Sequence, residues 1–164
     1  MSKTEEFLKA AFAGESQTNR RYLAFAARAE AEGFPQAARL FRAAAEGETV
    51  HAHNYLKALG GVRGTRENLR EAIGVETRAF QTVYPEMVEA ARAEGNKEAE
   101  EFFRYALETE RSHAELFQKL LETPEVPEGE EPYFVCPVCG WTAAWIPPST
   151  CPVCGAQDPE YIRV

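Results

Sequence analysis

Two sets of potential metal ligands repeat along the chain with nearly the same spacing. Glu15 is followed 33 residues later by the Glu-x-x-His sequence Glu48–His51, and Glu76 is followed 34 residues later by Glu110–His113. Residues three apart lie on one face of a helix, so both side chains of each Glu-x-x-His can point at one metal ion. Together the two sets supply four carboxylates and two imidazoles. This composition and spacing predict a site for two metal ions.

Apolar residues recur at spacings of three and four around each of these ligands, which predicts four amphipathic helices. The helices are expected at residues 4–32, 35–59, 66–94 and 97–122. Gly33 and Gly95 end the first and third helices, so successive helices form two hairpins, each with one ligand set. Pro85 lies within the third helix and is expected to kink it or to free a carbonyl, because proline has no backbone N–H.

These glutamates have two possible roles other than metal binding. A single Glu-x-x-His is common on solvated helix faces, but here both copies lie on apolar stripes. Buried carboxylates without a counter-charge cost several kcal/mol each, and arginine salt bridges could supply that charge. However, most of the nearby arginines fall off the stripes: Arg20, Arg21, Arg104 and Arg111. Bound cations therefore explain the pattern better.

The C-terminal tail contains all four cysteines, in two Cys-x-x-Cys pairs. They are Cys136 and Cys139, then Cys151 and Cys154. Two such pairs present four thiolates in a tetrahedron, and a module this small would scarcely fold without the metal. Iron and zinc both accept this geometry. The eleven residues between the pairs are fewer than in a zinc ribbon, and the accompanying two-metal site favours iron.

The composition divides the chain and limits its partners. We expect a helical domain at residues 1–123, an acidic, proline-rich linker at 124–132 and a metal-binding module at 133–164. A net charge of −8 without a basic cluster argues against nucleic acid. The N-terminus has no apolar signal core and no run of 18 apolar residues occurs, so a soluble cytoplasmic protein is expected, with no membrane partner.

Several local sequences resemble those of a known protein family. The first 123 residues resemble the ferritin-like di-iron carboxylate proteins, which share this ligand pattern. Closer resemblance, to the rubrerythrin family, rests on Gly14-Glu15-Ser16-Gln17 with Asn19, Arg20 and Tyr22, on Asn68-Leu69 before Glu76, and on Tyr84-Pro85-Glu86. It covers nearly the whole chain, because the short cysteine tail is similar to the rubredoxin-like module of that family. The fold class that this resemblance implies is mainly α: a ferritin-like four-helix bundle with a small rubredoxin-like module.

The resemblance also implies ligand roles. Glu48 and Glu110 would bridge two irons, with Glu15 and His51 completing one iron and Glu76 and His113 the other. Tyr22 and Tyr84 would place hydroxyls near the ligands, although plain core tyrosines are the alternative.

The function implied is a di-iron peroxidase of oxidative-stress defence that reduces hydrogen peroxide to water, with electrons relayed by the four-cysteine iron. An external reductase would supply them, since no Gly-x-Gly-x-x-Gly motif for NADH or flavin occurs. The alternatives are an oxygen-reducing or ferrous-oxidising di-iron protein, and a non-catalytic metal-binding protein with zinc in the tail.

One position departs from the family. Rubrerythrins usually carry a further glutamate three residues after the one matched by Glu76, and it exchanges with the histidine matched by His51. This chain has Ala79 there. We therefore expect His51 to stay bound in both oxidation states.

The connection between the hairpins is short for the fold. In the ferritin-like topology the second and third helices run parallel, so the chain must return by about 20 residues of helical rise, or ~30 Å. The five residues before Thr65 extend only ~17 Å. We therefore expect a homodimer with exchanged hairpins, in which each site takes Glu15, Glu48 and His51 from one subunit and the other three ligands from its partner.

Overall fold

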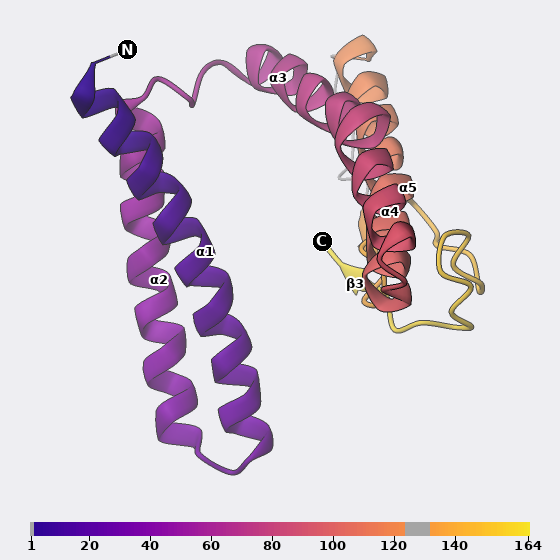
Figure 1. Cartoon of the computed structure of the whole chain (residues 1–164), viewed down its shortest axis with the longest axis horizontal. Coiled ribbons are helices and arrows are strands. Elements are labelled where there is room, and N and C mark those ends of the chain that lie inside the picture. Colours follow the sequence, from indigo (N-terminus) through magenta and orange to yellow (C-terminus); the bar gives the residue numbers. More distant parts are fainter. Residues whose placement is uncertain (1, 124–131) are drawn as a thin grey trace. The chain divides into compact units, whose positions relative to one another are not determined.

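The N-terminal part of the protein is a hairpin of two long helices. In the computed structural model, which describes residues 2–123 and 132–164, α1 spans Lys3–Ala31 and α2 spans Pro35–Ala58. Figure 1 shows them lying side by side and antiparallel. The turn between them has Gly33 at φ +80°, a conformation that costs glycine little, and Pro35 starts α2, where a missing N–H is tolerated.

Alanine lines the contact between these two helices. The buried apolar residues of the hairpin are Ala26, Ala29, Ala38, Ala45 and Ala52. Three of them recur every seven residues along α2, which keeps one small-residue stripe facing α1. Larger apolar side chains remain exposed, with Phe7 at 62% and Leu40 at 69%. Two helices that bury mainly alanine remove little apolar surface from water and gain little stability by themselves.

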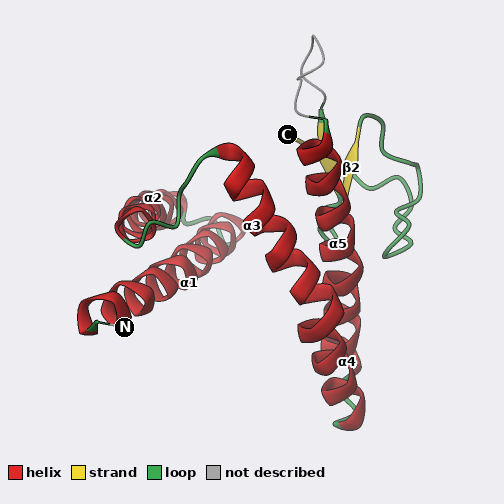
Figure 2. Ribbon diagram, turned by 90° about the horizontal axis from the view of Figure 1, so that it is seen from above, coloured by secondary structure: helices red, strands yellow, loops and turns green. Residues whose placement is uncertain are grey.

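The second helical part begins after a six-residue connection. It consists of α3 (Thr65–Arg78), a π-helical turn η1 (Ala79–Val83), α4 (Tyr84–Ala93) and α5 (Lys97–Glu122). Figure 2 shows α5 beside α4, and the first three elements form one continuous rod. The irregularity expected from Pro85 is therefore a π turn. The Tyr84 N–H bonds the Ala79 carbonyl five residues back, and Pro85, which cannot donate, follows in the first turn of α4.

The C-terminal tail forms a small antiparallel sheet that rests on α5. Its strands are β1 (Tyr133–Val135), β2 (Thr142–Ala144) and β3 (Ile162–Arg163), in the order β2-β1-β3. Tyr133 pairs with Ala144, and Phe134 pairs with Arg163. Because the strands are so short, the sheet serves mainly to hold the cysteine loops that it connects.

The structure divides into two compact units between the hairpins, at residues 63 and 64. The second unit contains both α3–α5 and the tail, so the compact units differ from the expected domains at 1–123 and 133–164. Residues 124–131 of the expected linker lie outside the described residues. None of the described helices is both long and apolar enough to span a membrane.

Candidate metal centres

The first ligand set comes together on the α1–α2 hairpin. We call Glu15, Glu48 and His51 the N-terminal half-site. Its register is fixed by Asn19, a buried amide that donates to the Ala45 carbonyl at 2.7 Å and to Thr49 Oγ1 at 2.8 Å. Asn19 lies one turn after Glu15, and its partners flank Glu48, so this tie places the two carboxylates opposite each other.

The N-terminal half-site has the dimensions of a metal site. The Nδ1 atom of His51 lies 3.5 Å from an oxygen of Glu48 and 3.7 Å from an oxygen of Glu15. Two donors bound at ~2.1 Å to one metal lie ~3–4 Å apart, so all three atoms fit around one ion. Hydrogen bonding to Glu48 raises the pKa of Glu15, which indicates two carboxylates held together where a cation would bind.

The second ligand set forms the same arrangement on α3 and α5. We call Glu76, Glu110 and His113 the C-terminal half-site. Nδ1 of His113 lies 3.0 Å from an oxygen of Glu110 and 4.0 Å from one of Glu76. Burial, with hydrogen bonding to Glu110 and its charge, raises the pKa of Glu76 to about 7. Two carboxyl groups held this close together form a pair that a divalent cation would stabilise.

The two tyrosines expected near the ligands lie in different surroundings. Burial and the charges of Glu110 and Glu76 raise the pKa of Tyr84, so its hydroxyl lies within electrostatic range of both carboxylates. The ring of Tyr22 instead packs against Phe25 and Phe41, with centroids 6.4 and 6.0 Å away. Within the described residues the Tyr22 hydroxyl has no hydrogen-bond partner.

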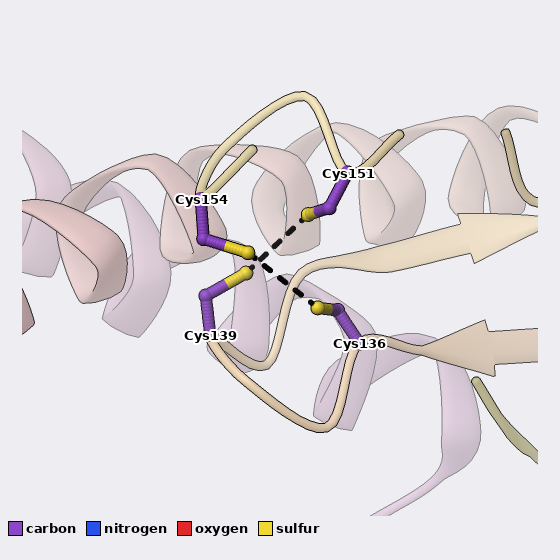
Figure 3. A group of neighbouring side chains, drawn as sticks. All are labelled: Cys136, Cys139, Cys151 and Cys154. Carbon is purple, nitrogen blue, oxygen red and sulfur yellow. Dashed lines mark hydrogen bonds between the residues drawn. The ribbon is translucent and has the colours of Figure 1, made fainter. Parts of the chain in front are cut away.

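The four cysteines converge on a single point in the tail. Figure 3 shows the sulfur atoms of the two Cys-x-x-Cys turns facing one another. The Cys136 and Cys154 sulfurs are 3.8 Å apart, and those of Cys139 and Cys151 are 3.6 Å apart. Four sulfurs at ~2.3 Å from a tetrahedral metal lie ~3.8 Å from one another, so the cluster has the right size for an ion.

The two cysteine turns share one backbone design. In each, the N–H of the glycine after the second cysteine bonds the carbonyl of the first cysteine at 2.9 Å. Both glycines have positive φ, +83° at Gly140 and +73° at Gly155, which explains why glycine follows each pair. Burial raises the pKa of Cys139 strongly. Burial also acts to raise the pKa of Cys151, but backbone N–H groups of Cys154 and Val153, together with the neighbouring thiols, lower it overall. The four side chains could therefore bind one cation as thiolates.

Two threonines that sequence reasoning missed connect the tail to the C-terminal half-site. Thr109 Oγ1 on α5 donates to the Cys139 carbonyl at 3.1 Å, and Thr142 Oγ1 on β2 lies 2.9 Å from Nε2 of His113. No spacing rule would have found them, because the contact joins residues about 30 positions apart through tertiary packing.

Comparison with known proteins identifies the family. The rubrerythrin family profile matches residues 6–121. The chain belongs to the rubrerythrin family. It is 36% identical to rubrerythrin-2 of Clostridium acetobutylicum, over 96% of this chain and 95% of that protein, and 35% identical to rubrerythrin of Porphyromonas gingivalis, over 93% and 86%.

The structural comparison agrees with the sequence comparison. The solved structure of a fully reduced, all-ferrous nigerythrin matches with a TM-score of 0.60 at 27% sequence identity. The match covers 100% of this chain and 88% of the nigerythrin chain. The predicted fold class is thereby confirmed as mainly α and ferritin-like, with a C-terminal four-cysteine cluster. As a rubrerythrin-family member, the chain is a di-iron-type carboxylate protein with a role in oxidative stress, which makes an oxidoreductase the consistent class.

Proposed function

We propose that this rubrerythrin-family protein is a di-iron peroxidase that reduces hydrogen peroxide to water. The observation that carries the proposal is the set of two matching carboxylate–imidazole half-sites, one of which is hydrogen-bonded to Thr142 in the four-cysteine module. Two ferrous irons would supply two electrons, which with two protons cleave H₂O₂ into two molecules of water. The four-cysteine iron would return these electrons one at a time, from an external reductase or electron carrier.

The ligand atoms support a division of roles. Glu48 and Glu110 each lie close to their own histidine, at 3.5 and 3.0 Å, on the same helix, and as the second carboxylates of each set they would bridge the metals. Glu15 and His51 would complete one iron, and Glu76 and His113 the other. Both histidines turn Nδ1 toward the carboxylates, so both would bind through that atom.

Tyr84 would assist by holding a proton near the carboxylates. Its raised pKa keeps the hydroxyl protonated at neutral pH, so it can donate a hydrogen bond to a carboxylate or to bound peroxide. The Tyr22 hydroxyl, which has no other partner within the described residues, would donate a hydrogen bond at the N-terminal half-site. The test for both is substitution with phenylalanine, which removes only the hydroxyl.

We also propose that each complete site is built from two chains. His51 lies seven residues before the end of α2 at Ala58, and Glu76 lies eleven after the start of α3 at Thr65. If α2 and α3 ran parallel in one bundle with His51 and Glu76 at the same height, the connection would have to run back ~27 Å along the bundle axis. It would also have to cross ~8–10 Å from one helix axis to the next. The connection from Ala58 to Thr65 spans at most ~25 Å when fully extended. A homodimer that exchanges hairpins removes this conflict and also covers the exposed apolar side chains of each hairpin.

Iron is the proposed metal at all three positions, with zinc in the tail as the alternative. The four free thiols and the absence of a spanning helix among the described residues fit a cytoplasmic, reducing location. Metal analysis with a visible spectrum tests this. A ferric four-thiolate centre absorbs strongly, so a colourless protein that contains only zinc would exclude the electron relay.

The reaction is tested by its oxidant. A fully reduced sample is mixed anaerobically with hydrogen peroxide or, separately, with dioxygen at the same concentration. We expect faster reoxidation by peroxide. Faster reoxidation by dioxygen would contradict the peroxidase assignment.

Ala79 favours a second candidate, an oxygen-reducing or ferrous-oxidising protein. This position lies in the π turn, and no carboxylate is available there to replace His51 as an iron changes oxidation state. Ala79→Glu restores the family's usual residue. If the missing carboxylate decides the oxidant, this variant will favour peroxide more strongly than the natural chain does.

A further inference from the structure

The four-cysteine tail and the C-terminal half-site are joined by two hydrogen bonds from one face of α5. Thr109 and His113 lie four residues apart, so their side chains point the same way. Thr109 is only 5% exposed, and its hydroxyl donates to the backbone carbonyl of Cys139, one of the four clustered cysteines. His113 reaches Thr142 on β2. A ligand of one centre is therefore connected to a strand that follows directly from the cysteine turn of the other.

The partners of Thr142 determine which way its hydrogen bonds run. Thr142 Oγ1 lies 3.3 Å from the Gly140 carbonyl oxygen, which can only accept, so the hydroxyl can donate to it. When a metal occupies Nδ1, the imidazole proton is on Nε2, and the hydroxyl can accept a hydrogen bond from it at 2.9 Å while it donates to Gly140. Without a metal, Nδ1 lies 3.0 Å from Glu110 Oε2 and can donate to it, whereas a metal at Nδ1 selects the tautomer with the proton on Nε2. Nδ1 is the atom that faces Glu110 and Glu76, so this is the tautomer that a metal in the half-site requires.

Among the described residues of one chain, the N-terminal half-site has no such support. His51 is 56% exposed, whereas His113 is 28% exposed. Within the described residues, nothing hydrogen-bonds Nε2 of His51. The two imidazoles therefore differ in what fixes them, although their Nδ1 atoms face carboxylates in the same manner.

We propose that Thr142 is a positioning residue, which holds His113 in the metal-binding tautomer and orientation, and that Thr109 docks the four-cysteine turn on the same helix. The tail would thus serve the half-site carried by its own α5, and electrons would enter the di-iron site on the His113 side. In each transfer, the four-cysteine iron would be oxidised from ferrous to ferric and the iron held by His113 reduced from ferric to ferrous. Electron entry at His113 rests on the proposed function, whereas the hydrogen bonding of His113 does not.

The first test uses zinc-reconstituted, ¹⁵N-histidine-labelled protein and needs no redox activity. NMR measures how fast the His113 Nε2 proton exchanges with water. We expect Thr142→Val to accelerate exchange by about tenfold, because one hydrogen bond is lost, while Thr142→Ser retains the natural rate. Thr150→Val is the matched control, since it removes a hydroxyl of the same module that bonds Gln157 instead. Unchanged exchange in Thr142→Val would overturn the proposal.

Thr142→Ala guards against a packing effect of valine, and it should match Thr142→Val. The visible band of each iron-loaded variant reports whether the module is folded. Acceleration by Thr150→Val as large as that by Thr142→Val would also overturn the proposal, because the effect would then reflect general loosening of the tail.

The second test follows electron entry. The fully reduced iron protein is mixed with hydrogen peroxide, and the return of the ferric four-thiolate band is timed. We expect Thr142→Val and Thr109→Val each to slow this by about tenfold, with Thr142→Ser and Thr150→Val unchanged. If the natural protein shows a protected His113 proton but no reoxidation of the tail by peroxide, the peroxidase function fails while the positioning role stands. If peroxide reoxidises the tail and Thr142→Val alters neither measurement, the positioning role fails and the function stands.

Discussion

The two half-sites use the same three residue types at nearly the same spacing, yet they are held differently. In the N-terminal half-site the hairpin supplies all the support, through the Asn19 tie between α1 and α2. In the C-terminal half-site, Nε2 of His113, the nitrogen that faces away from the carboxylates, is hydrogen-bonded to Thr142 on a strand of the cysteine module. The sequence repeat therefore describes ligand identity but not ligand rigidity. Within one chain, the His113 imidazole is hydrogen-bonded at its second nitrogen, whereas the His51 imidazole is 56% exposed.

Removing the cysteine metal should have the largest effect on this difference. Cys151→Ser takes away one of four thiolates, and a module of this size depends on its metal to fold. We expect loss of the visible band and peroxide turnover at the background rate, because the electron relay is broken. Ser149→Ala is a suitable control, since it alters the same loop without touching a thiolate.

The same variant should make the half-sites more alike. Without the folded module, His113 loses Thr142 and becomes exposed like His51. Its Nε2 proton should then exchange rapidly with water in the zinc form. Continued protection of that proton would show that α5 alone orders His113, which would contradict the comparison.

Deleting each imidazole should reveal the inequality directly. We expect His113→Ala to weaken Zn²⁺ binding at its half-site by about 100-fold and His51→Ala by only about tenfold, because a preorganised ligand contributes more to affinity. Titration calorimetry of the metal-free protein measures both. His53→Ala is the matched control, an exposed histidine two residues from His51. Equal losses for the two ligand variants would remove the proposed difference in rigidity.

A smaller effect is expected from pH in the metal-free protein. Burial and Glu110 raise the pKa of Glu76 to about 7, above its ordinary value of 4.5. The folded state therefore binds a proton more tightly than the unfolded state, so its stability should fall as pH rises from about 4.5 to about 7. Because 21% of the Glu76 side chain is still exposed, solvent screening reduces the effect.

Chemical unfolding at several pH values measures this slope. Glu76→Gln should reduce it, and Glu86→Gln, at an exposed position further along the same rod, should leave it unchanged. A slope that survives Glu76→Gln undiminished would assign the pH dependence to another group.

Much of the molecule could be predicted from particular residues. The repeat of one glutamate followed by Glu-x-x-His identified the six residues that the structure gathers into two clusters. Within each Glu-x-x-His, a helix puts residues three apart on one face. Gly33 and Gly95 marked the helix ends, and the Cys-x-x-Cys pairs marked the third cluster. Each of these signals is local, so it can be read without knowing the fold.

What could not be predicted depends on contacts between distant residues. Pro85 indicated an irregular helix, but not that the irregularity would be a π turn over Ala79–Val83. Thr109 and Thr142 look like ordinary helix and strand residues, and only the docking of the tail gives them partners. The asymmetry between the half-sites follows from that docking and so was invisible in the repeat.

The exchange of hairpins is the central claim, and complementation of two defective chains tests it most directly. Glu48→Ala and Glu110→Ala chains are co-expressed with different tags, and the mixed dimer is purified through both. With exchanged hairpins, one site combines both defects and the other combines two natural half-sites. The mixed dimer should therefore have about half the natural iron content of the carboxylate sites and about half the natural peroxide turnover, although each parent dimer has neither. A mixed dimer as defective as its parents would show that every site is made by a single chain.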